Sequence, residues 1–553
     1  MRLTSLRCRV RGSRLALAGL AAVTGIALAA CGSSGSSAGA GAGAGSGSGG
    51  SGTPVSGGTL KVDLSAAPDC LDPAVAFTAD ERAIVRPLAD SLVSMSDKGT
   101  IEPWLATSWS VNKDATVYTF HLKPGVTFSD GTPVTATAVK DTFDYLVKNL
   151  ETTSTRGRGY LSAYKETKVV NSLTAEVVFS KPSVQFLAGA STTTLAIVST
   201  SSASKTPDQR CAGDFVGSGP FTMTNYTQGQ SVTETRRAGY DWGPATATHT
   251  GAAYLSGIDF QVVDTSNARD GALESGQTDV ALDIATQDVP ALKGAGVTPL
   301  FGTQPGMPAS FVVNTTKPGL SDPTVRQAMT MGLNRAADVK AVLGSYYTPA
   351  TSLLTHNLPE YTNESAAMAY DPAKAKQELQ SAGWVAGPGG TREKGGVKLS
   401  FSVAYTDSYG AYYTSLLQLF QQDMKAIGIN ITLDDLTEAQ QVSEGLSHNF
   451  DLDITSLTDA DPDVLRSTLG VLFPDAQALQ TTGIDTLFTQ SDAEPVQAQR
   501  SATYAKIQNL MISNGFVIPF WEGGQFVGYT SKVHGLEMDF QSWLVFYDTW
   551  LSS

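Results

Sequence analysis

The stretch IEPWLATSWSVNKDATVYTFHLKPGVTFSDGTPVTATAV, residues 101–139, alternates runs of β-forming residues with tight-turn pairs. Residues 117–122 are rich in β-branched and aromatic side chains, and a Pro-Gly pair and then an Asp-Gly pair follow them. Thr135 can cap a helix that continues beyond the stretch. The pattern therefore predicts strand, turn, strand, turn and helix, in this order. The apolar side chains expected on one face of the helix are Val139, Phe143 and Leu146.

The chain outside this stretch indicates an α/β fold. Residues 59–64 alternate as a strand does, before a loop rich in proline and aspartate. A helix is expected from Asp322, its N-cap, to an exit at Gly344, because a proline follows the cap directly. Residues 399–435 contain a strand, a helix and a further strand, which predicts a parallel or mixed sheet. No internal repeat and no second loose linker is present, so we expect two lobes within one compact body.

The N-terminal residues have the features of an export signal. Five arginines precede an apolar run at residues 15–30, which is too short to span a bilayer comfortably. The run ends in Leu-Ala-Ala-Cys, which resembles the bacterial lipobox, so residues 1–30 are the expected signal peptide and Cys31 the expected lipidation site. Residues 31–57 are dominated by Gly, Ser and Ala and predict a flexible tether. The alternative is an ordinary signal peptide whose cysteine is incidental.

Two cysteines, Cys70 and Cys211, remain in the expected exported body. An oxidising compartment favours a disulfide between them. In the chain-entropy model, closing a loop of this length stabilises the fold by roughly 4–5 kcal/mol. Two buried free thiols are the alternative.

Charge and motifs exclude several functions. The formal net charge is −14, which would repel phosphate backbones, so nucleic acid is not an expected partner. The five histidines are scattered, and the expected folded body has neither a Gly-x-Ser-x-Gly elbow nor a phosphate-binding loop. We therefore expect no cofactor, no metal site and no enzymatic activity. A hydrolase with a carboxylate dyad stays open, because many carboxylate pairs are conceivable.

The segment FDLDITSLTDADPDVLRS concentrates aspartates and allows three interpretations. Asp459, Asp461 and Asp463 alternate like the first ligands of a calcium loop, but a proline interrupts them and no glycine follows at the required place. A strand at residues 452–457 that runs into an Asp-Pro turn is the second interpretation. The third is a ligand-contacting loop, because sites in α/β sheets lie at the carboxyl ends of strands.

The opening stretch resembles the signature of the family 5 extracellular solute-binding proteins, the peptide/nickel-binding subunits of bacterial ABC importers. That signature runs Leu-Ala-x-x-Trp, then Asp, then Tyr-x-Phe-x-Leu-x-x-Gly-Val-x-Phe-x-Asp-Gly-x-Pro-Val. The family usually has an acidic residue directly before the helix position of Val139, where this chain has Thr137 and Ala138. The matching positions are Leu105, Ala106, Trp109, Asp114, Tyr118, Phe120, Leu122, Gly125, Val126, Phe128, Asp130, Gly131, Pro133 and Val134.

Further motifs follow in the order that the family has. VGSGPFTMTNYTQGQ is similar to its Gly-Thr-Gly-Pro motif, and VVNTTKPGLSDPTVRQAMTMGLNR to its Asp-x-x-Val-Arg-x-Ala motif. YDPAKAKQELQSAGW and IPFWEGGQFVGYTSKVHGLEMD resemble two later segments. The resemblance covers the chain from about Gly58 to its C-terminus.

The resemblance implies a two-lobed α/β fold of the periplasmic-binding-protein type (the large type II, or cluster C, group), with two hinge strands between the lobes. Lobe 1 would comprise residues 58–310 and 528–553, with an extra subdomain at about 92–205, and lobe 2 residues 311–527. It implies a monomeric lipoprotein at the extracytoplasmic face of the bacterial cell membrane. Such a protein would capture oligopeptides or dipeptides and deliver them to the ABC permease subunits.

Other ligands remain open, since family members also bind nickel chelates, oligosaccharides and opines. A binder of the same fold for a non-peptide solute is therefore an alternative, and a ligand-sensing lipoprotein is another. The five dispersed histidines give a nickel ligand no support.

The resemblance also suggests ligand-binding residues. In peptide-binding relatives an aspartate before an Asp-Pro turn pairs with the amino terminus of the peptide. Asp459 is the nearest equivalent, although its spacing is one residue shorter than in dipeptide binders. Aromatic candidates could stack on a side chain or a sugar, or simply pack in the core. The other candidates are Asp69, Leu71 and Asp72 in the loop after the first strand, Asn314 near the hinge, Tyr405 after its strand, and Trp521 after the Val-Ile-Pro-Phe run.

Overall fold

The computed structural model describes residues 52–149, 155–406 and 410–552, and residues 49–553 form one compact unit. The predicted signal peptide, Cys31 and most of the predicted linker lie outside the described residues. Within the described residues, none of the helices combines the length and the apolar character needed to cross a membrane.

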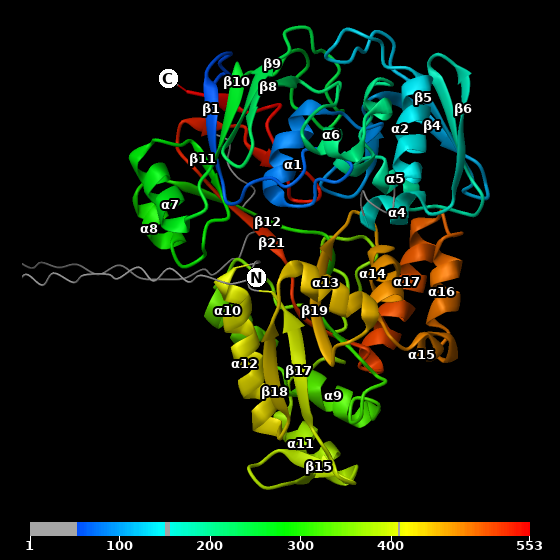
Figure 1. Ribbon diagram of the computed structural model, residues 1–553, viewed down its shortest axis with the longest axis vertical. Coiled ribbons are helices and arrows are strands. Elements are labelled where there is room, and N and C mark those ends of the chain that lie inside the picture. The colour runs from blue at the N-terminus through cyan, green and yellow to red at the C-terminus, as the bar shows by residue number, and fades with distance from the viewer. Residues whose placement is uncertain (1–51, 150–154, 407–409, 553) are drawn as a thin grey trace, which may run out of the picture. The chain divides into compact units, whose positions relative to one another are not determined.

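The main sheet of lobe 1 has seven described strands in the order β12-β21-β11-β1-β10-β9-β8 (Figure 1). Strand β1 (Thr59–Leu64) pairs in parallel with β10 and β11, and its side chains Leu60, Val62 and Leu64 are fully buried. The strand predicted at residues 59–64 is therefore confirmed. The other strands are β8 (Phe221–Thr227), β9 (Ser231–Arg236), β10 (Gly257–Val262), β11 (Val280–Leu282), β12 (Thr298–Thr303) and β21 (Gly524–Tyr529).

Short elements complete lobe 1. The helices are α1 (Ala79–Val85), η1 (Arg86–Leu88), α6 (Pro207–Cys211), α7 (Ser266–Ser275) and α8 (Val289–Gly294). The strand pairs outside the main sheet are β2 (Val93–Met95) with β3 (Ile101–Pro103), β22 (Val533–His534) with β25 (Trp550–Leu551), and β23 (Glu537–Met538) with β24 (Leu544–Val545).

The opening stretch of sequence builds a separate four-stranded sheet, β4-β5-β7-β6, and its covering helix. Strand β5 (Val117–Leu122) and helix α2 (Ala136–Lys148) confirm two of the predicted elements, and the expected apolar face of α2 is buried. Thr135 occupies the N-cap position without a capping hydrogen bond from its side chain. The remaining elements are β4 (Ala106–Val111), α4 (Thr155–Leu161), β6 (Tyr164–Asn171), β7 (Thr174–Phe179), α5 (Phe186–Gly189), η2 (Thr193–Leu195) and η3 (Ser202–Ser204).

The strand predicted between the two turns of that stretch is wrong. Thr127 makes only an isolated bridge, to Pro133. The guanidinium of Arg237 donates to the carbonyl oxygens of Thr127 and Phe128, at 3.1 and 2.9 Å. A side chain therefore satisfies the carbonyl groups that a neighbouring strand would otherwise have used.

Lobe 2 is built on a five-stranded sheet of described residues, in the order β18-β17-β19-β13-β20 (Figure 1). Strands β17 and β18 pair in parallel, and α12 connects them, which confirms the predicted strand–helix–strand order. The strands are β13 (Gly306–Val313), β17 (Ser400–Tyr405), β18 (Asn430–Asp435), β19 (Leu452–Thr458) and β20 (Val517–Trp521). A small sheet contains β14 (Val385–Ala386), β15 (Arg392–Lys394) and β16 (Val397–Lys398). The helices are α9 (Pro323–Gly332), α10 (Arg335–Leu343), α11 (Pro372–Ser381), α12 (Ala411–Ile427), α13 (Glu438–Ser447), α14 (Val464–Leu472), α15 (Ala476–Thr481), α16 (Ile484–Ser491) and α17 (Gln497–Ser513).

The single helix expected from Asp322 to Gly344 is two helices. Asp322 caps α9 as predicted, but Leu333 is extended and the side chain of Asn334 caps α10 by accepting from the Ala337 N–H. The asparagine offers the backbone a new helix start, and this signal could have been recognised in the sequence.

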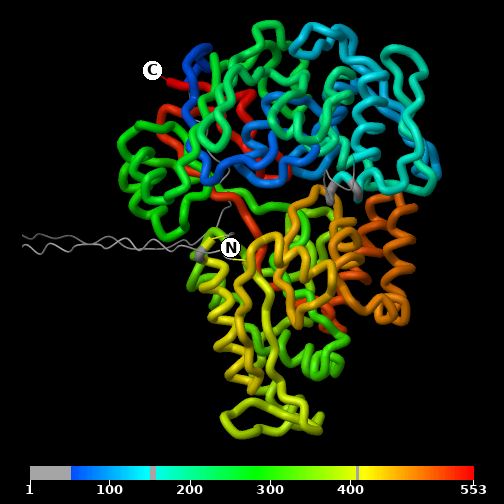
Figure 2. The backbone as a smooth tube through the Cα atoms, in the orientation of Figure 1, coloured from blue at the N-terminus to red at the C-terminus, as the bar shows by residue number. Residues whose placement is uncertain are grey.

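The chain passes between the two main sheets twice, at residues 304–305 and 522–523 (Figures 1 and 2). Strands β12 and β21 pair with each other in lobe 1, and β13 and β20 pair in lobe 2. The two crossing segments lie side by side, because the Gln304 N–H donates to the Gly523 carbonyl at 3.0 Å. The lobe limits expected at 310 and 528 fall inside β13 and β21.

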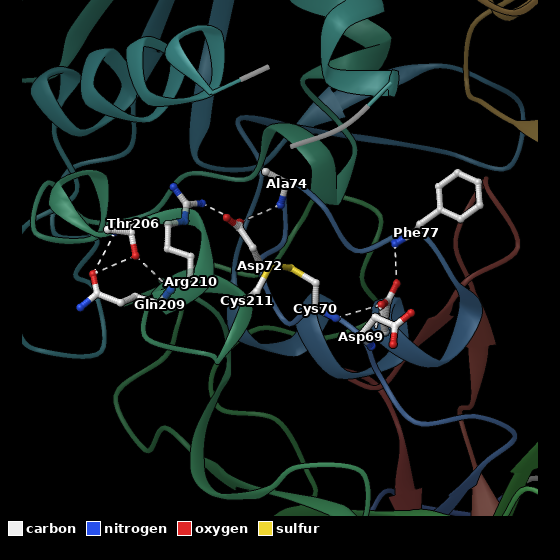
Figure 3. Close-up of a disulfide and its surroundings, with 10 residues drawn as sticks. Asp69, Cys70, Asp72, Ala74, Phe77, Thr206, Gln209, Arg210 and Cys211 are labelled. Atoms are coloured by element: carbon white, nitrogen blue, oxygen red, sulfur yellow. Dashed lines mark hydrogen bonds and ion pairs between the residues drawn. A yellow bond between two sulfur atoms is a disulfide. The ribbon is translucent and has the colours of Figure 1, made fainter. Parts of the chain in front are cut away.

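A disulfide between Cys70 and Cys211 joins the loop after β1 to α6 (Figure 3). The predicted pairing is present, and the cysteines lie 141 residues apart in the sequence. Two further contacts join the same segments. The Leu71 N–H donates to the Cys211 carbonyl at 2.9 Å, and the Arg210 guanidinium donates to the Asp72 carboxylate at 2.6 Å.

We expect replacement of both cysteines with serine to lower the free energy of unfolding by about 4 kcal/mol, because the unfolded chain regains the entropy of a long loop. Chemical denaturation of the purified protein measures the change. Dithiothreitol should destabilise the wild type by a similar amount and leave the double variant unchanged. Equal stability of the two proteins would contradict the expectation.

Candidate ligand-binding site

A cavity of about 280 Å³ lies between the lobes, beside the two crossing segments; we call it the interlobe cavity. Lobe 1 contributes the segment that leads into α1, together with a tryptophan from the C-terminal region. Lobe 2 contributes α12, the start of α13 and the end of β19. The lining residues are Phe77, Thr78, Ala79, Gln304, Tyr412, Tyr413, Glu438, Ser456, Leu457, Thr458, Trp521, Gly523, Gly524 and Trp543.

One wall of the interlobe cavity is aromatic. The rings of Trp521 and Tyr413 meet edge to face, with 4.9 Å between their centroids, and Tyr412 lies 5.2 Å from Tyr413. Pairing between β20 and β13 fixes the Trp521 backbone opposite Ala309. Burial raises the pKa of Tyr413, and a hydrogen bond with Ser456 opposes this effect. Tyr412 is partly exposed and presents a flat ring with a hydroxyl edge, which suits rings and aliphatic groups, whereas Trp521 and Tyr413 are buried and support this wall from the core of lobe 2.

The charge of the cavity lining is negative. Glu438, at the first position of α13, is the one ionisable carboxylate among the described lining residues, and no lysine, arginine or histidine accompanies it there. An anionic group would find no charge partner in this part of the lining. A cationic or neutral group fits it better.

The loop after β1 places Phe77 and Thr78 in the cavity through one buried carboxylate. Glu81 accepts from the N–H groups of Asp69 and Cys70 with one oxygen, both at 3.1 Å. Its other oxygen accepts from Phe77 at 2.7 Å and from Thr78 at 3.0 Å. Four backbone donors thus converge on one side chain that is 4% exposed. Figure 3 shows the loop from the disulfide to Phe77.

The predicted site residues of this loop anchor it and do not line the cavity. Asp72 is completely buried, pairs with Arg210 and accepts from the Ala74 N–H at 3.0 Å. Leu71 is buried in the core of lobe 1. Asp69 is exposed, and its backbone is bound by Glu81. The part of this segment that lines the cavity is residues 77–79.

Asn314 and Tyr405 also lie away from the interlobe cavity. Asn314 was expected near the hinge, but it follows the far end of β13, roughly 25 Å from the crossing at a rise of about 3.3 Å per residue. Its amide donates to the carbonyl oxygens of His448 and Phe450, at 3.2 and 2.9 Å. Tyr405 ends β17, and its ring is buried in the core of lobe 2. Of the seven predicted ligand residues, Trp521 is the one that lines the cavity.

Asp459 is buried and contacts lobe 1. Its carboxylate accepts from the Tyr160 hydroxyl of α4 and from the Asp461 N–H, the latter at 3.0 Å. Its own N–H donates to the Pro305 carbonyl at 2.9 Å. Asp459 therefore links the end of β19 to the first crossing segment and to the subdomain of lobe 1.

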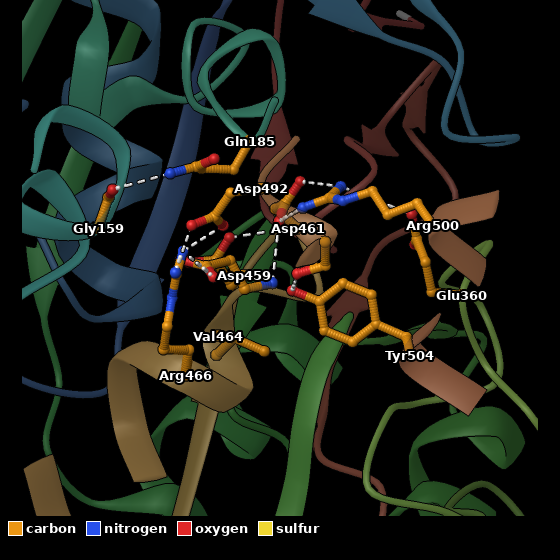
Figure 4. Close-up of polar contacts among 12 residues, drawn as sticks. Gly159, Gln185, Glu360, Asp459, Asp461, Val464, Arg466, Asp492, Arg500 and Tyr504 are labelled. Carbon is orange, nitrogen blue, oxygen red and sulfur yellow. Dashed lines mark hydrogen bonds and ion pairs between the residues drawn. The ribbon is translucent and has the colours of Figure 1, made fainter. Parts of the chain in front are cut away.

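The neighbouring aspartates have different partners (Figure 4). Asp461 binds both terminal nitrogens of Arg500, at 2.6 and 2.7 Å, and Asp463 pairs with Arg466 at 2.7 Å. Arg466 also binds Asp492. Among the described residues there is no group of three or more histidine, cysteine, aspartate or glutamate side chains that could hold a metal ion. Ion pairs and the turn after β19 thus account for Asp459, Asp461 and Asp463.

The residues that sequence reasoning missed are aromatic. Tyr412 and Tyr413 begin α12 directly beyond the carboxyl end of β17, where sites in α/β sheets are expected, so their position was a usable signal. Phe77 is 43% exposed on a loop, but no sequence pattern indicated that it faces the other lobe. Trp543 comes from the C-terminal region, and its place depends on long-range packing.

Two α/β lobes, two crossings and a cavity between the lobes define a ligand-binding protein of the two-lobed periplasmic class. The family model described as "Bacterial extracellular solute-binding proteins, family 5 Middle" matches residues 100–477. The chain belongs to this family of extracytoplasmic solute-binding proteins of ABC importers, which are transport proteins and not enzymes.

Individual relatives agree with the family assignment. The glutathione-binding protein GsiB of Shigella flexneri is 26% identical over 385 residues, which cover 68% of this chain and 69% of that protein. NikA from Brucella suis, solved in complex with Fe(III)-EDTA, has a similar fold with a TM-score of 0.77, at 21% identity over 90% of this chain and 100% of its own. DppA from Helicobacter pylori, in complex with the peptide STSA, has a TM-score of 0.73, at 20% identity over 90% and 99% of the two chains.

We expect Glu81→Gln to lower the free energy of unfolding by about 2–3 kcal/mol, because an amide nitrogen would then face two backbone N–H donors that lose their acceptor. Chemical denaturation measures the loss. Glu274→Gln, which changes an exposed glutamate of α7, is the matched control and should change stability by less than about 0.5 kcal/mol. An equally small effect of both substitutions would show that the carboxylate is not needed to hold the loop.

Proposed function

We propose that this protein is the binding lipoprotein of an ABC importer for short peptides, and that it works as a monomer attached to the membrane through a lipid on Cys31. The interlobe cavity would hold the peptide between the lobes. Closure of the lobes around the two crossing segments would then present the peptide to the permease.

The observation that carries the peptide assignment is an unpaired strand edge in the cavity. Strand β17 pairs with β19 only at Leu452 and Asp453, so the end of β19 has no strand partner on that side among the described residues. The Asp459 N–H points toward β13, since it donates to Pro305. Backbone groups alternate along a strand, so those of Ser456 and Thr458 face the opposite, unpaired side. A peptide main chain can pair with exactly such groups by adding a strand.

The cavity lining supports the same ligand class. Tyr412 is partly exposed and offers a surface for a side chain, with Trp521 and Tyr413 buried beside it, and Glu438 offers a charge partner for an amino group. The small volume of the cavity favours a peptide of few residues over a long one. The peptide bound to DppA and the glutathione of the GsiB name are ligands of the same chemical class.

We expect the protein purified from its natural host to carry peptides of a few residues. Native mass spectrometry followed by denaturing release would give masses spaced like amino-acid residues. Tyr412→Ala should lower the amount of bound peptide at least tenfold, whereas Tyr370→Ala, at a tyrosine that is 48% exposed outside the cavity, should not. A single non-peptide mass would overturn the peptide assignment and favour a different solute on the same fold.

We expect Cys31→Ser to release the protein from the membrane, because the thiol that carries the lipid is lost. Fractionation of host cells, with detection by antibody, measures the distribution between membrane and soluble fractions. A membrane fraction as large as that of the wild type would contradict lipid anchoring at Cys31.

A further inference from the structure

A second cavity, of about 220 Å³, adjoins the interlobe cavity; we call it the α13–α14 pocket. Phe77, Glu438, Ser456 and Leu457 line both cavities, so a ligand that lies along the end of β19 reaches both. The remaining walls come from helices α13 and α14 and from the middle of β19.

The entrance of the α13–α14 pocket is apolar and partly open to solvent. Val442 and Leu446 lie one helical turn apart on α13, and Val471 lies on α14. These side chains are 54%, 58% and 47% exposed, although large aliphatic residues are usually buried. An aliphatic ligand chain bound in the pocket would cover these exposed side chains.

The polar groups of the pocket are buried deeper. Asp453 is 3% exposed, and Gln441 donates to one of its carboxylate oxygens at 2.8 Å. Its other oxygen has no hydrogen bond from the described residues. Thr468 is 7% exposed, and its hydroxyl has no hydrogen-bond partner in the described part of the chain. A buried carboxylate and an unpartnered hydroxyl therefore line a pocket with an apolar entrance.

The charges around the pocket have one sign. Glu438 and Asp453 are both carboxylates, and no lysine, arginine or histidine is among the described residues that line it. Burial raises the pKa of Asp453 to about 7, an effect that the Gln441 hydrogen bond opposes. A cation bound beside Asp453 would favour its ionised form.

We propose that the α13–α14 pocket is the subsite for one basic side chain of the peptide, of the lysine, ornithine or arginine type. This inference rests on the proposed peptide-binding function. The methylene groups of the side chain pack between Val442, Leu446 and Val471. Its terminal ammonium or guanidinium group donates to the second oxygen of Asp453, beside the Thr468 hydroxyl. The long basic side chain thus matches both the apolar entrance and the acidic interior.

The test uses matched peptides of two to five residues, in which one position holds either lysine or norleucine, the uncharged analogue of the lysine stem. Isothermal titration calorimetry on the full-length protein should give at least tenfold tighter binding of the lysine peptide at one position. Asp453→Asn keeps an acceptor for Gln441 and should reduce this ratio to less than threefold, with norleucine peptides bound as before. Thr468→Val, which removes only the hydroxyl, should weaken the lysine peptide a few-fold.

Asp434→Asn changes an exposed aspartate of β18 outside the pocket and should keep the wild-type ratio. Equal affinity of the wild type for lysine and norleucine peptides would overturn the subsite and leave peptide binding intact. A preference for lysine that survives in Asp453→Asn would also overturn it. Binding of none of the peptides would overturn the proposed function together with the subsite.

Discussion

The carboxylate of Glu81 accepts hydrogen bonds from four backbone N–H groups, and the lobe 1 side of the interlobe cavity depends on this interaction. A loop without regular structure has to satisfy its own polar groups when it is buried. Here one side chain in the first turn of α1 satisfies the middle of the loop, at Asp69 and Cys70, and its end, at Phe77 and Thr78. The loop closes on the helix, and Phe77 and Thr78 are held at the edge of the cavity.

The disulfide and the Asp72–Arg210 pair fix the same loop from the other side. Both partners of that ion pair are buried, so its contribution lies in specific geometry more than in net stability. Arg210 also lies 4.1 Å over the ring of Tyr145 in α2. The loop that reaches the ligand cavity is thus connected to the subdomain as well as to α6. This connection holds the loop to the rest of lobe 1 at several points.

The fold was predictable because its signals are local. Turn pairs, caps and strand patterns lie within short stretches, and their order along the chain resembled one family. The roles of polar side chains were less predictable. Asp72, Asn314 and Asp459 were expected to contact ligand, but each has partners in the protein. Each side chain accepts from the residue two positions on and also binds a residue 130 to 300 positions away in sequence. A sequence shows that a polar side chain needs a partner, but not whether the protein itself provides one.

The aromatic residues of the cavity were predictable only where they follow the carboxyl end of a strand. Tyr412 and Tyr413 follow the carboxyl end of β17, so a search at strand ends finds them. Phe77 and Trp543 depend instead on how distant segments pack. The second strand predicted in the opening stretch is absent, and a distant residue is involved here too. Arg237, more than 100 residues away in sequence, donates to the carbonyl groups of this segment.

The occupation of Asp459 has a consequence for how the proposed peptide ligand is recognised. The family resemblance implies that an aspartate at this position binds the cationic amino terminus of the peptide in peptide-binding relatives. Here its carboxylate already accepts from Tyr160 and from the Asp461 backbone, which leaves less capacity for a ligand cation. The negative charges that line the two adjoining cavities come from Glu438 and Asp453 instead. The carboxylates that bind a ligand cation would then lie on α13 and in the middle of β19. A basic side chain of the peptide would contribute more to affinity than in relatives that bind the peptide's amino terminus at the turn.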